Sequence, residues 1–159
     1  MSAPVAVTVR ANDASWPETL TSRLGEGAPQ RLYTIGSIDL LASRKIALLC
    51  SAHVSGDAIL RAYDAAQKLR DDGVTVISGF HSPIEKDCLE ILLRGKQPII
   101  ICLARAMEKI RLPSAWRVAL DAALADEVLI IHATSGGQIE RISELVNSWR
   151  IPVRKLDPM

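Results

Sequence analysis

The sequence predicts an α/β fold in which helices cover both faces of a mostly parallel sheet. From residue 45 onward, short runs of apolar residues alternate with longer segments in which apolar residues recur at helical spacing. The strand-like runs are almost uninterrupted by polar residues, which is typical of strands buried on both faces. Strands that alternate with helices of this length form right-handed βαβ units. We therefore expect a Rossmann-like three-layer sandwich with a short N-terminal arm.

Composition limits the possible functions further. The chain has 159 residues, 48% of them hydrophobic and 23% charged, which suits one globular domain and excludes a wholly disordered chain. Its formal net charge of +1 excludes a protein held on nucleic acid by bulk charge, so phosphate contacts would need a local patch or backbone amides. No membrane span or signal peptide is recognisable, and the three cysteines lack metal-ligand spacing. These features predict a cytoplasmic protein with reduced thiols and no membrane contact.

The first thirty residues differ from the rest of the chain. Residues 11–30 are rich in turn-forming residues and show little periodicity, apart from one short helix expected over residues 17–24. We therefore expect two parts: an N-terminal arm or small extension over residues 1–30, and a Rossmann-like domain over residues 31–159. The domain would begin with a short strand over residues 31–36.

The elements that follow are predicted from apolar runs and from the residues that end helices. Gly73 and Gly95 end two of the helical patterns, and Pro113 splits a third. Strands are expected over residues 46–50, 74–78, 97–103, 127–132 and 151–155, and helices over residues 58–69, 84–94, 106–110, 114–124 and 138–149.

Ligands of open parallel sheets bind beyond the carboxyl ends of the strands. Three of the four turns expected there are rich in serine and glycine and lead into a helix, so their amides could face a phosphate. Alternatively, these residues only supply the tight turn and the helix cap. The candidate ligand-binding residues are Ser51, His53, Ser78, Gly79, Phe80, His81, Ser82, Glu85, Arg105, Ser135, Gly136 and Gly137.

Individual roles within this set stay open. Arg105 would clamp a phosphate or be an ordinary surface arginine. Phe80 would stack on a base or pack over the sheet edge. Glu85 would bond a ribose hydroxyl or a base edge, or would only favour the dipole of its helix. The loop histidines suit hydrogen bonding, because no carboxylate or cysteine stands at metal-ligand spacing from them.

No motif in the sequence identifies an enzyme. A Walker lysine loop, GxGxxG, GxSxG and HExxH are all absent, and no base is paired by motif with any candidate serine. We therefore predict a binding protein without catalytic residues, metal or cofactor.

Four segments in register resemble one family. Ser78-Gly-Phe-His-Ser-Pro-Ile-Glu85 resembles the SGxAxGID segment of the DNA-processing protein A (DprA/Smf) family, and Trp16-Pro-Glu-Thr-Leu20 is similar to its YPxxL. Leu32-Tyr-Thr-Ile-Gly-Ser-Ile-Asp-Leu-Leu41 resembles its vLyxxGdxxlL stretch, and Ile46-Ala-Leu-Leu-Cys-Ser51 its vaiVGSR strand. The order and spacing agree over about residues 16–103.

The resemblance implies a Rossmann-like member of the DprA/LOG-type superfamily that binds nucleotides or nucleic acid at this sheet edge. It further implies single-stranded DNA as ligand, a homodimer and a recombinase partner. By position, the implied pocket residues are Ser51, Ser78, Gly79, His81, Ser82 and Glu85.

The sequence also departs from the family pattern. Cys50 and Ala52 stand where the family has the glycine and arginine of GSR, which removes one phosphate-binding cation. His81, Ser82 and Pro83 replace the alanine, arginine and glycine of the later segment, so that turn lacks a basic group and one amide donor.

Three functions follow from these observations. The first is a DprA-like module that binds a single strand or a nucleotide through the Ser51, Ser78 and Ser135 turns. The second is a sensor or partner module for a small nucleotide, which the near-neutral charge favours. The third is a nucleotide N-glycosidic hydrolase, which would require Glu85 or Glu140 to face a ribose; the PGGxGTxxE motif of that class is incomplete after Ser135.

Overall fold

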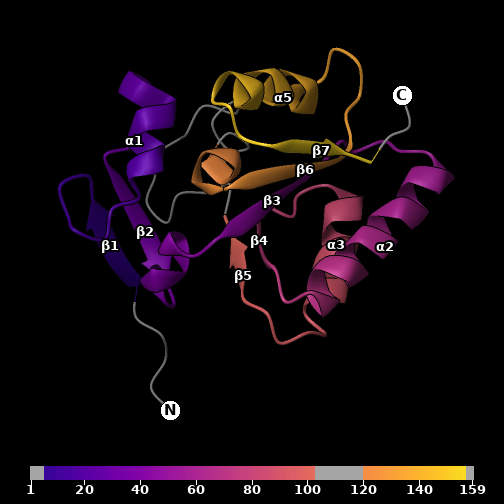
Figure 1. The fold of residues 1–159 in the computed structure, drawn as a ribbon, viewed down its shortest axis with the longest axis horizontal. Coiled ribbons are helices and arrows are strands. Elements are labelled where there is room, and N and C mark those ends of the chain that lie inside the picture. Colours follow the sequence, from indigo (N-terminus) through magenta and orange to yellow (C-terminus); the bar gives the residue numbers. More distant parts are fainter. Residues whose placement is uncertain (1–5, 103–119, 157–159) are drawn as a thin grey trace.

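The computed structural model describes residues 6–102 and 120–156. A twisted parallel sheet lies at its centre, with α2 (Gly56–Asp71) and α3 (Pro83–Leu92) on one face and α5 (Gln138–Ser148) on the other (Figure 1). Residues 120–124 are helical as well. The other elements are β1 (Ala6–Arg10), α1 (Glu18–Leu24), η1 (Gly25–Gly27), β2 (Arg31–Ile35), η2 (Ile38–Ala42), β3 (Lys45–Cys50), β4 (Thr75–Ser78), β5 (Ile99–Ile101), β6 (Glu127–His132) and β7 (Val153–Lys155).

The described strands of the main sheet have the order β5-β4-β3-β6-β7, and all four neighbouring pairs are parallel. The predicted Rossmann-like α/β class is therefore confirmed. From β3 the chain first builds the sheet outward to β5, and it then returns to add β6 on the other side of β3. The carboxyl ends of β3 and β6 thus form the switch point at which ligands of such sheets bind.

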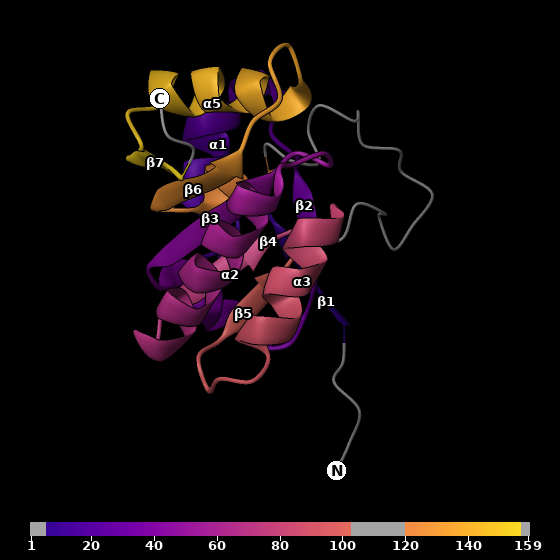
Figure 2. The same ribbon diagram turned by 90° about the vertical axis from the view of Figure 1, so that its right-hand side faces the viewer.

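The continuous apolar run of β3 is explained by burial on both of its faces. Ile46 and Leu48 pack in one core cluster with α2 and α3, while Ala47 and Leu49 pack in another with α5. Side chains of a strand alternate between its faces, so a strand covered on both sides needs apolar residues at every position. Figure 2 shows α2 and α3 side by side over one face of the sheet, with α5 over the opposite face.

Most predicted elements are present, with shifts at their ends. The strand predicted over residues 127–132 has the same bounds as β6. β5 is shorter than the predicted strand over residues 97–103, because Pro98 has no amide for the ladder and its pairing with β4 begins at Ile99. The helix predicted over residues 106–110, and the first part of that over residues 114–124, lie outside the described residues.

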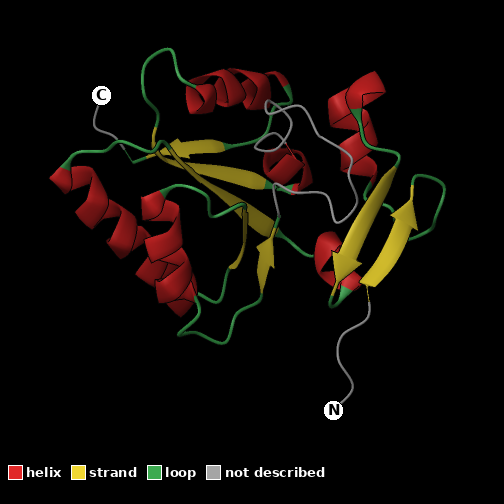
Figure 3. Cartoon of the chain, turned by 180° about the vertical axis from the view of Figure 1, so that it is seen from behind, coloured by secondary structure: helices red, strands yellow, loops and turns green. Residues whose placement is uncertain are grey.

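One strand was not predicted. β1 pairs antiparallel with β2 in a separate two-stranded ribbon, and this ribbon lies beside the main sheet (Figure 3). It joins residues from both sides of the boundary expected at residue 30; the division into two parts itself stays a prediction. The overlooked signal was the alternation of valine and threonine in residues 5–9, which is typical of a strand.

The N-terminal arm is tied to the core by packing and by one cation. Trp16 and Leu20 are buried in the hydrophobic core cluster that lies between the sheet and α5. Arg23 of α1 donates two hydrogen bonds through Nη1, to the carbonyl oxygens of Ala123 at 2.9 Å and Ala125 at 2.6 Å. These carbonyls end the helix of residues 120–124, so the arginine caps that helix.

The three cysteines are reduced, with Cys50 and Cys88 buried and Cys102 half-buried. Burial raises the pKa of Cys88 to about 12, which keeps this thiol protonated at neutral pH. In the ranges that the structure describes, no helix combines the length and the apolar character that crossing a membrane requires.

Candidate functional site

The structure brings three of the predicted turns together at the carboxyl edge of the sheet, because β4, β3 and β6 are neighbours. Two hydrogen bonds join the turn after β3 to β6 and its turn: the Ser51 amide donates to the His132 carbonyl, and the Thr134 amide donates to Ser51 Oγ, both at 2.9 Å. Ser51 therefore lies at the switch point between β3 and β6. Arg105, in the fourth predicted turn, lies outside the described residues.

The turn after β4 is organised by Glu85. This carboxylate is 5% exposed and accepts hydrogen bonds from the amides of Cys50 at 2.8 Å, His81 at 2.9 Å and Ser82 at 3.1 Å. Ser82 Oγ accepts in return from the Glu85 amide at 3.3 Å, which completes a capping box at the start of α3. Two amides expected to face a phosphate are thus bonded to the protein's own carboxylate. The ribose contact of Glu85 stays a prediction.

Ser78 and Phe80 of the same turn are buried. Ser78 Oγ donates to the Leu48 carbonyl at 2.8 Å and accepts from the Phe80 amide at 3.1 Å. Phe80 has a φ of 50°, uncommon for a bulky side chain, and is 4% exposed in the cluster beneath α2 and α3. The ring thus packs over the sheet edge in this structure, and its stacking on a base stays a prediction.

The remaining candidate residues in the turns after β3 and β4 are polar or small, and they are accessible to solvent. His53 and His81 are exposed in the turns after β3 and β4. The His81 imidazole lies against Gly79 so closely that a Cβ at residue 79 would collide with it. Glycine at this position therefore allows the imidazole to lie across the turn.

The amino end of α5 differs from those of α2 and α3. Ser55 Oγ caps α2 by accepting from the Ala58 amide at 3.3 Å, and α3 has its capping box. α5 begins after Gly137 without a side-chain cap hydrogen bond. The Gly137 amide donates to the Thr134 carbonyl at 2.9 Å, while Ser135 and Gly136 are exposed. A helix that begins after a glycine has no capping side chain in the way, and its dipole makes this end suited to an anion.

Asp121 is a site residue that the sequence analysis missed. It is 2% exposed, and its carboxyl is hydrogen-bonded to the Gly79 amide and the Cys102 thiol. Burial raises its pKa to about 7, with a smaller contribution from the charge of Glu85; the two hydrogen bonds oppose this shift. One signal was available, because Asp121 is the single charged residue in the apolar segment of residues 118–125.

Solved structures share this fold. DNA processing protein A from Streptococcus pneumoniae is 16% identical with a TM-score of 0.78, and the match covers 96% of this chain and 63% of that one. This chain thus spans less than two thirds of that relative. DNA processing protein A from Helicobacter pylori, which has a unique single-stranded DNA binding mode, is 16% identical with a TM-score of 0.75, covering 97% of this chain and 81% of that one.

A molybdenum cofactor binding protein from Rippkaea orientalis is more distant, at 12% identity and a TM-score of 0.61, with 74% of this chain and 78% of that one covered. At these identities the likenesses establish the fold alone. No curated protein matches the sequence. A sequence model of the family described as DNA recombination-mediator protein A matches residues 7–143. Since the match extends over most of its length, this chain belongs to the DNA recombination-mediator protein A family.

Proposed function

We propose that this chain binds single-stranded DNA at the carboxyl edge of its parallel sheet. The observation that carries the proposal is the amino end of α5, where Gly137 provides no side-chain cap. The turn that leads into this helix is hydrogen-bonded to Ser51 at the switch point between β3 and β6. A backbone phosphate would accept hydrogen bonds from the first amides of α5 and from the turn of Ser135 and Gly136. The exposed imidazoles of His53 and His81 would contact neighbouring parts of the strand, and Arg105 would add a cation.

Family membership supports this ligand, as does the fold shared with the Helicobacter pylori protein that binds single-stranded DNA. Because few backbone donors and no bulk charge are available, affinity would be moderate and dependent on salt. The homodimer and the recombinase partner implied by the resemblance belong to the same proposal. So does the expected cytoplasmic location, where a protein that handles DNA would meet its ligand.

We further infer that the site binds its ligand without chemistry of its own. The hydroxyls of Ser51, Ser78 and Ser82 form their hydrogen bonds with backbone groups, so their geometry serves the turns rather than a nucleophile. Glu85, which a hydrolase would need at a ribose, is instead buried against three amides.

A small phosphate-bearing ligand is the alternative to a DNA strand. The fold is shared with the Rippkaea orientalis molybdenum cofactor binding protein. The net charge of +1 is also compatible with a ligand of few charges. A mononucleotide would use the same α5 amides, so competition between a mononucleotide and an oligonucleotide discriminates the two.

The test places a carboxylate at the start of α5. Gly137 has φ −86° and ψ 179°, a conformation that an aspartate N-cap adopts. A Cβ there would lie 3.0 Å from the Thr134 carbonyl oxygen, and an aspartate and an asparagine share this crowding equally. Gly137→Asp would occupy the first-turn amides and repel a phosphate, whereas Gly137→Asn has the same shape and no charge. We expect fluorescence anisotropy with a labelled oligothymidylate to show roughly tenfold weaker binding for the aspartate variant than for the asparagine variant. Equal binding by wild type and both variants would contradict the α5 site, and binding that mononucleotides abolish at equal concentration would favour the small ligand.

A further inference from the structure

Two arginines face each other across the β1–β2 ribbon. Arg10 of β1 is directly opposite Arg31 of β2 in the antiparallel register, and both side chains are exposed. Like charges at directly opposed positions repel and destabilise a strand pair. In the described part of the chain neither guanidinium forms an ion pair, and Asp13 accepts its hydrogen bond from the backbone amide of Arg10. Among the described residues, no side-chain ion pair therefore offsets their repulsion.

An aromatic ring completes this face of the ribbon. Tyr33 follows Arg31 by two residues, which places both side chains on the same face of β2. The guanidinium carbon of Arg31 is 5.9 Å from the centroid of the Tyr33 ring, within the range of a cation–π contact. A planar ring beside two cations offers a base a stacking surface close to two phosphate ligands.

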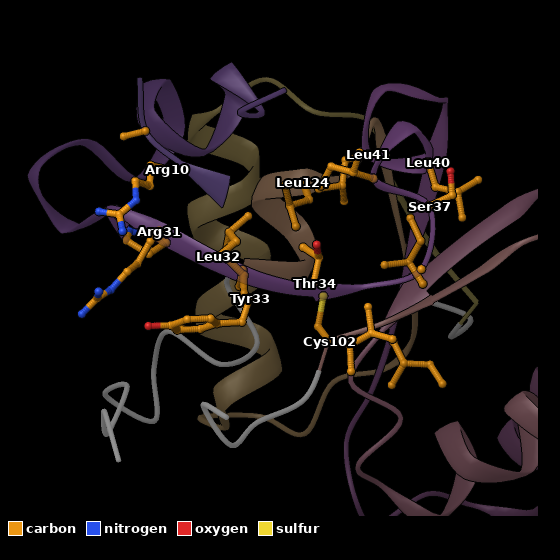
Figure 4. Close-up of a pocket in the computed structure, with 18 of the residues that line it drawn as sticks. Arg10, Arg31, Leu32, Tyr33, Thr34, Ser37, Leu40, Leu41, Cys102 and Leu124 are labelled. Carbon is orange, nitrogen blue, oxygen red and sulfur yellow. The ribbon is translucent and has the colours of Figure 1, made fainter. Parts of the chain in front are cut away.

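These residues lie at one end of a pocket between the ribbon, β5 and the helix of residues 120–124. The pocket has a volume of about 1060 Å³ and is lined elsewhere mostly by aliphatic side chains, among them Leu32, Leu41, Ile100, Leu120 and Leu124. Figure 4 shows the two guanidinium groups and the tyrosine hydroxyl at the same end, with Leu32 and Leu124 farther in. A groove with an apolar interior and a cationic end complements a polymer of apolar bases and anionic phosphates.

We propose that Arg10, Arg31 and Tyr33 form a second contact surface for single-stranded DNA, separate from the turns at the carboxyl edge of the sheet. The two arginines bind consecutive phosphates, and Tyr33 stacks on a base between them. This inference rests on the proposed function, because it assigns to the ribbon another part of the same ligand. The surface would lengthen the stretch of strand that the chain contacts and would supply cationic groups that the turns lack.

The experiment compares two double variants that each remove two positive charges. Arg10→Gln with Arg31→Gln removes the ribbon cations, and Arg94→Gln with Lys96→Gln removes two exposed cations after α3. We expect the ribbon variant to bind an oligothymidylate of about 20 nucleotides roughly tenfold more weakly than wild type. The slope of log K against log salt concentration should fall in magnitude by about 1.4, because each phosphate contact with a single strand contributes about 0.7. The control should bind as wild type. Because the ribbon variant relieves a repulsion, it should melt at the same or a higher temperature than wild type.

A second readout locates the contact. An oligonucleotide with 5-iodouracil, crosslinked to wild type by light, should label Tyr33 within the tryptic peptide of residues 32–44. If wild type binds and the ribbon variant binds with the same affinity, the ribbon surface is overturned and the proposed function stands. Crosslinks confined to other peptides would have the same meaning. Absence of binding by wild type would overturn the proposed function, and the ribbon surface with it.

Discussion

Replacing Asp121 with asparagine tests how the buried acid beneath the turn after β4 affects stability. Burial raises the pKa of Asp121 from 3.8 to about 7 in the folded chain. The folded state therefore binds this proton more tightly than the unfolded state, so the contribution of Asp121 to stability is largest when the carboxyl is protonated. It falls as the pH rises through the window between these two values, and the loss is complete above the folded pKa.

The size of this loss follows from the shift. Each pKa unit corresponds to about 1.4 kcal/mol, so the unfolding free energy of wild type should fall by roughly 2 kcal/mol between about pH 5 and pH 7. Asp121→Asn keeps the shape and removes the titration. It also places an NH₂ group near the position of Oδ1, which has no partner among the described groups, at a cost of about 1–3 kcal/mol that is the same at both pH values.

The assay is urea unfolding at the two pH values, followed by the fluorescence of the three tryptophans, of which Trp16 is buried in the core. We expect the stability of Asp121→Asn relative to wild type to rise by roughly 2 kcal/mol between about pH 5 and pH 7. The control is Asp64→Asn, which removes a negative charge from an exposed position on α2. A stability difference between Asp121→Asn and wild type that is independent of pH would refute the argument from burial.

Two further predictions concern residues that join parts of the fold. Arg23→Ala should lower the unfolding free energy by roughly 2–3 kcal/mol, because it removes two charged hydrogen bonds to the carbonyls of Ala123 and Ala125. Urea unfolding measures this loss, with Arg23→Lys as the comparison variant. Equal stability of the alanine variant and wild type would contradict the prediction. Glu85→Gln should cost roughly 2–4 kcal/mol, because one acceptor oxygen cannot serve the three amides that the carboxylate binds. Faster hydrogen exchange at the amides of Cys50, His81 and Ser82 should accompany that loss, and unchanged exchange would count against it.

The sequence predicted the parts of the fold that depend on local patterns. Apolar runs identified β3 and β6 because strands buried on both faces need apolar residues at every position. Because the carboxyl ends of parallel strands lie at one edge of a sheet, the predicted topology also placed the Ser51, Ser78 and Ser135 turns at the same edge. β1 was not predicted, because the alternation in residues 5–9 is short, and its partner β2 follows some twenty residues later in the sequence.

The hydrogen-bond partners of the site amides could not be predicted from the sequence. The capping box of Ser82 and Glu85 is a local motif, but the further bond of Glu85 to the Cys50 amide depends on how α3 packs on β3. The bond of Asp121 to Gly79 likewise depends on the packing of a segment forty residues away. The left-handed conformation of Phe80 follows from the same packing, because its ring is held in the core beneath α2 and α3.

These contacts change which part of the edge is best suited to an anion. In the turn after β4, the amides of Gly79, His81 and Ser82 are bonded to carboxylates of the chain itself. A phosphate there would have to displace Glu85 or approach its charge at close range, and both are unfavourable in a buried site. At the start of α5, after β6, Gly137 provides no side-chain cap hydrogen bond, and Glu140 is the acid in the first turn of that helix. We therefore expect substitutions at Gly137 to weaken DNA binding more than substitutions at His81, although the resemblance to the family places both turns at the same pocket.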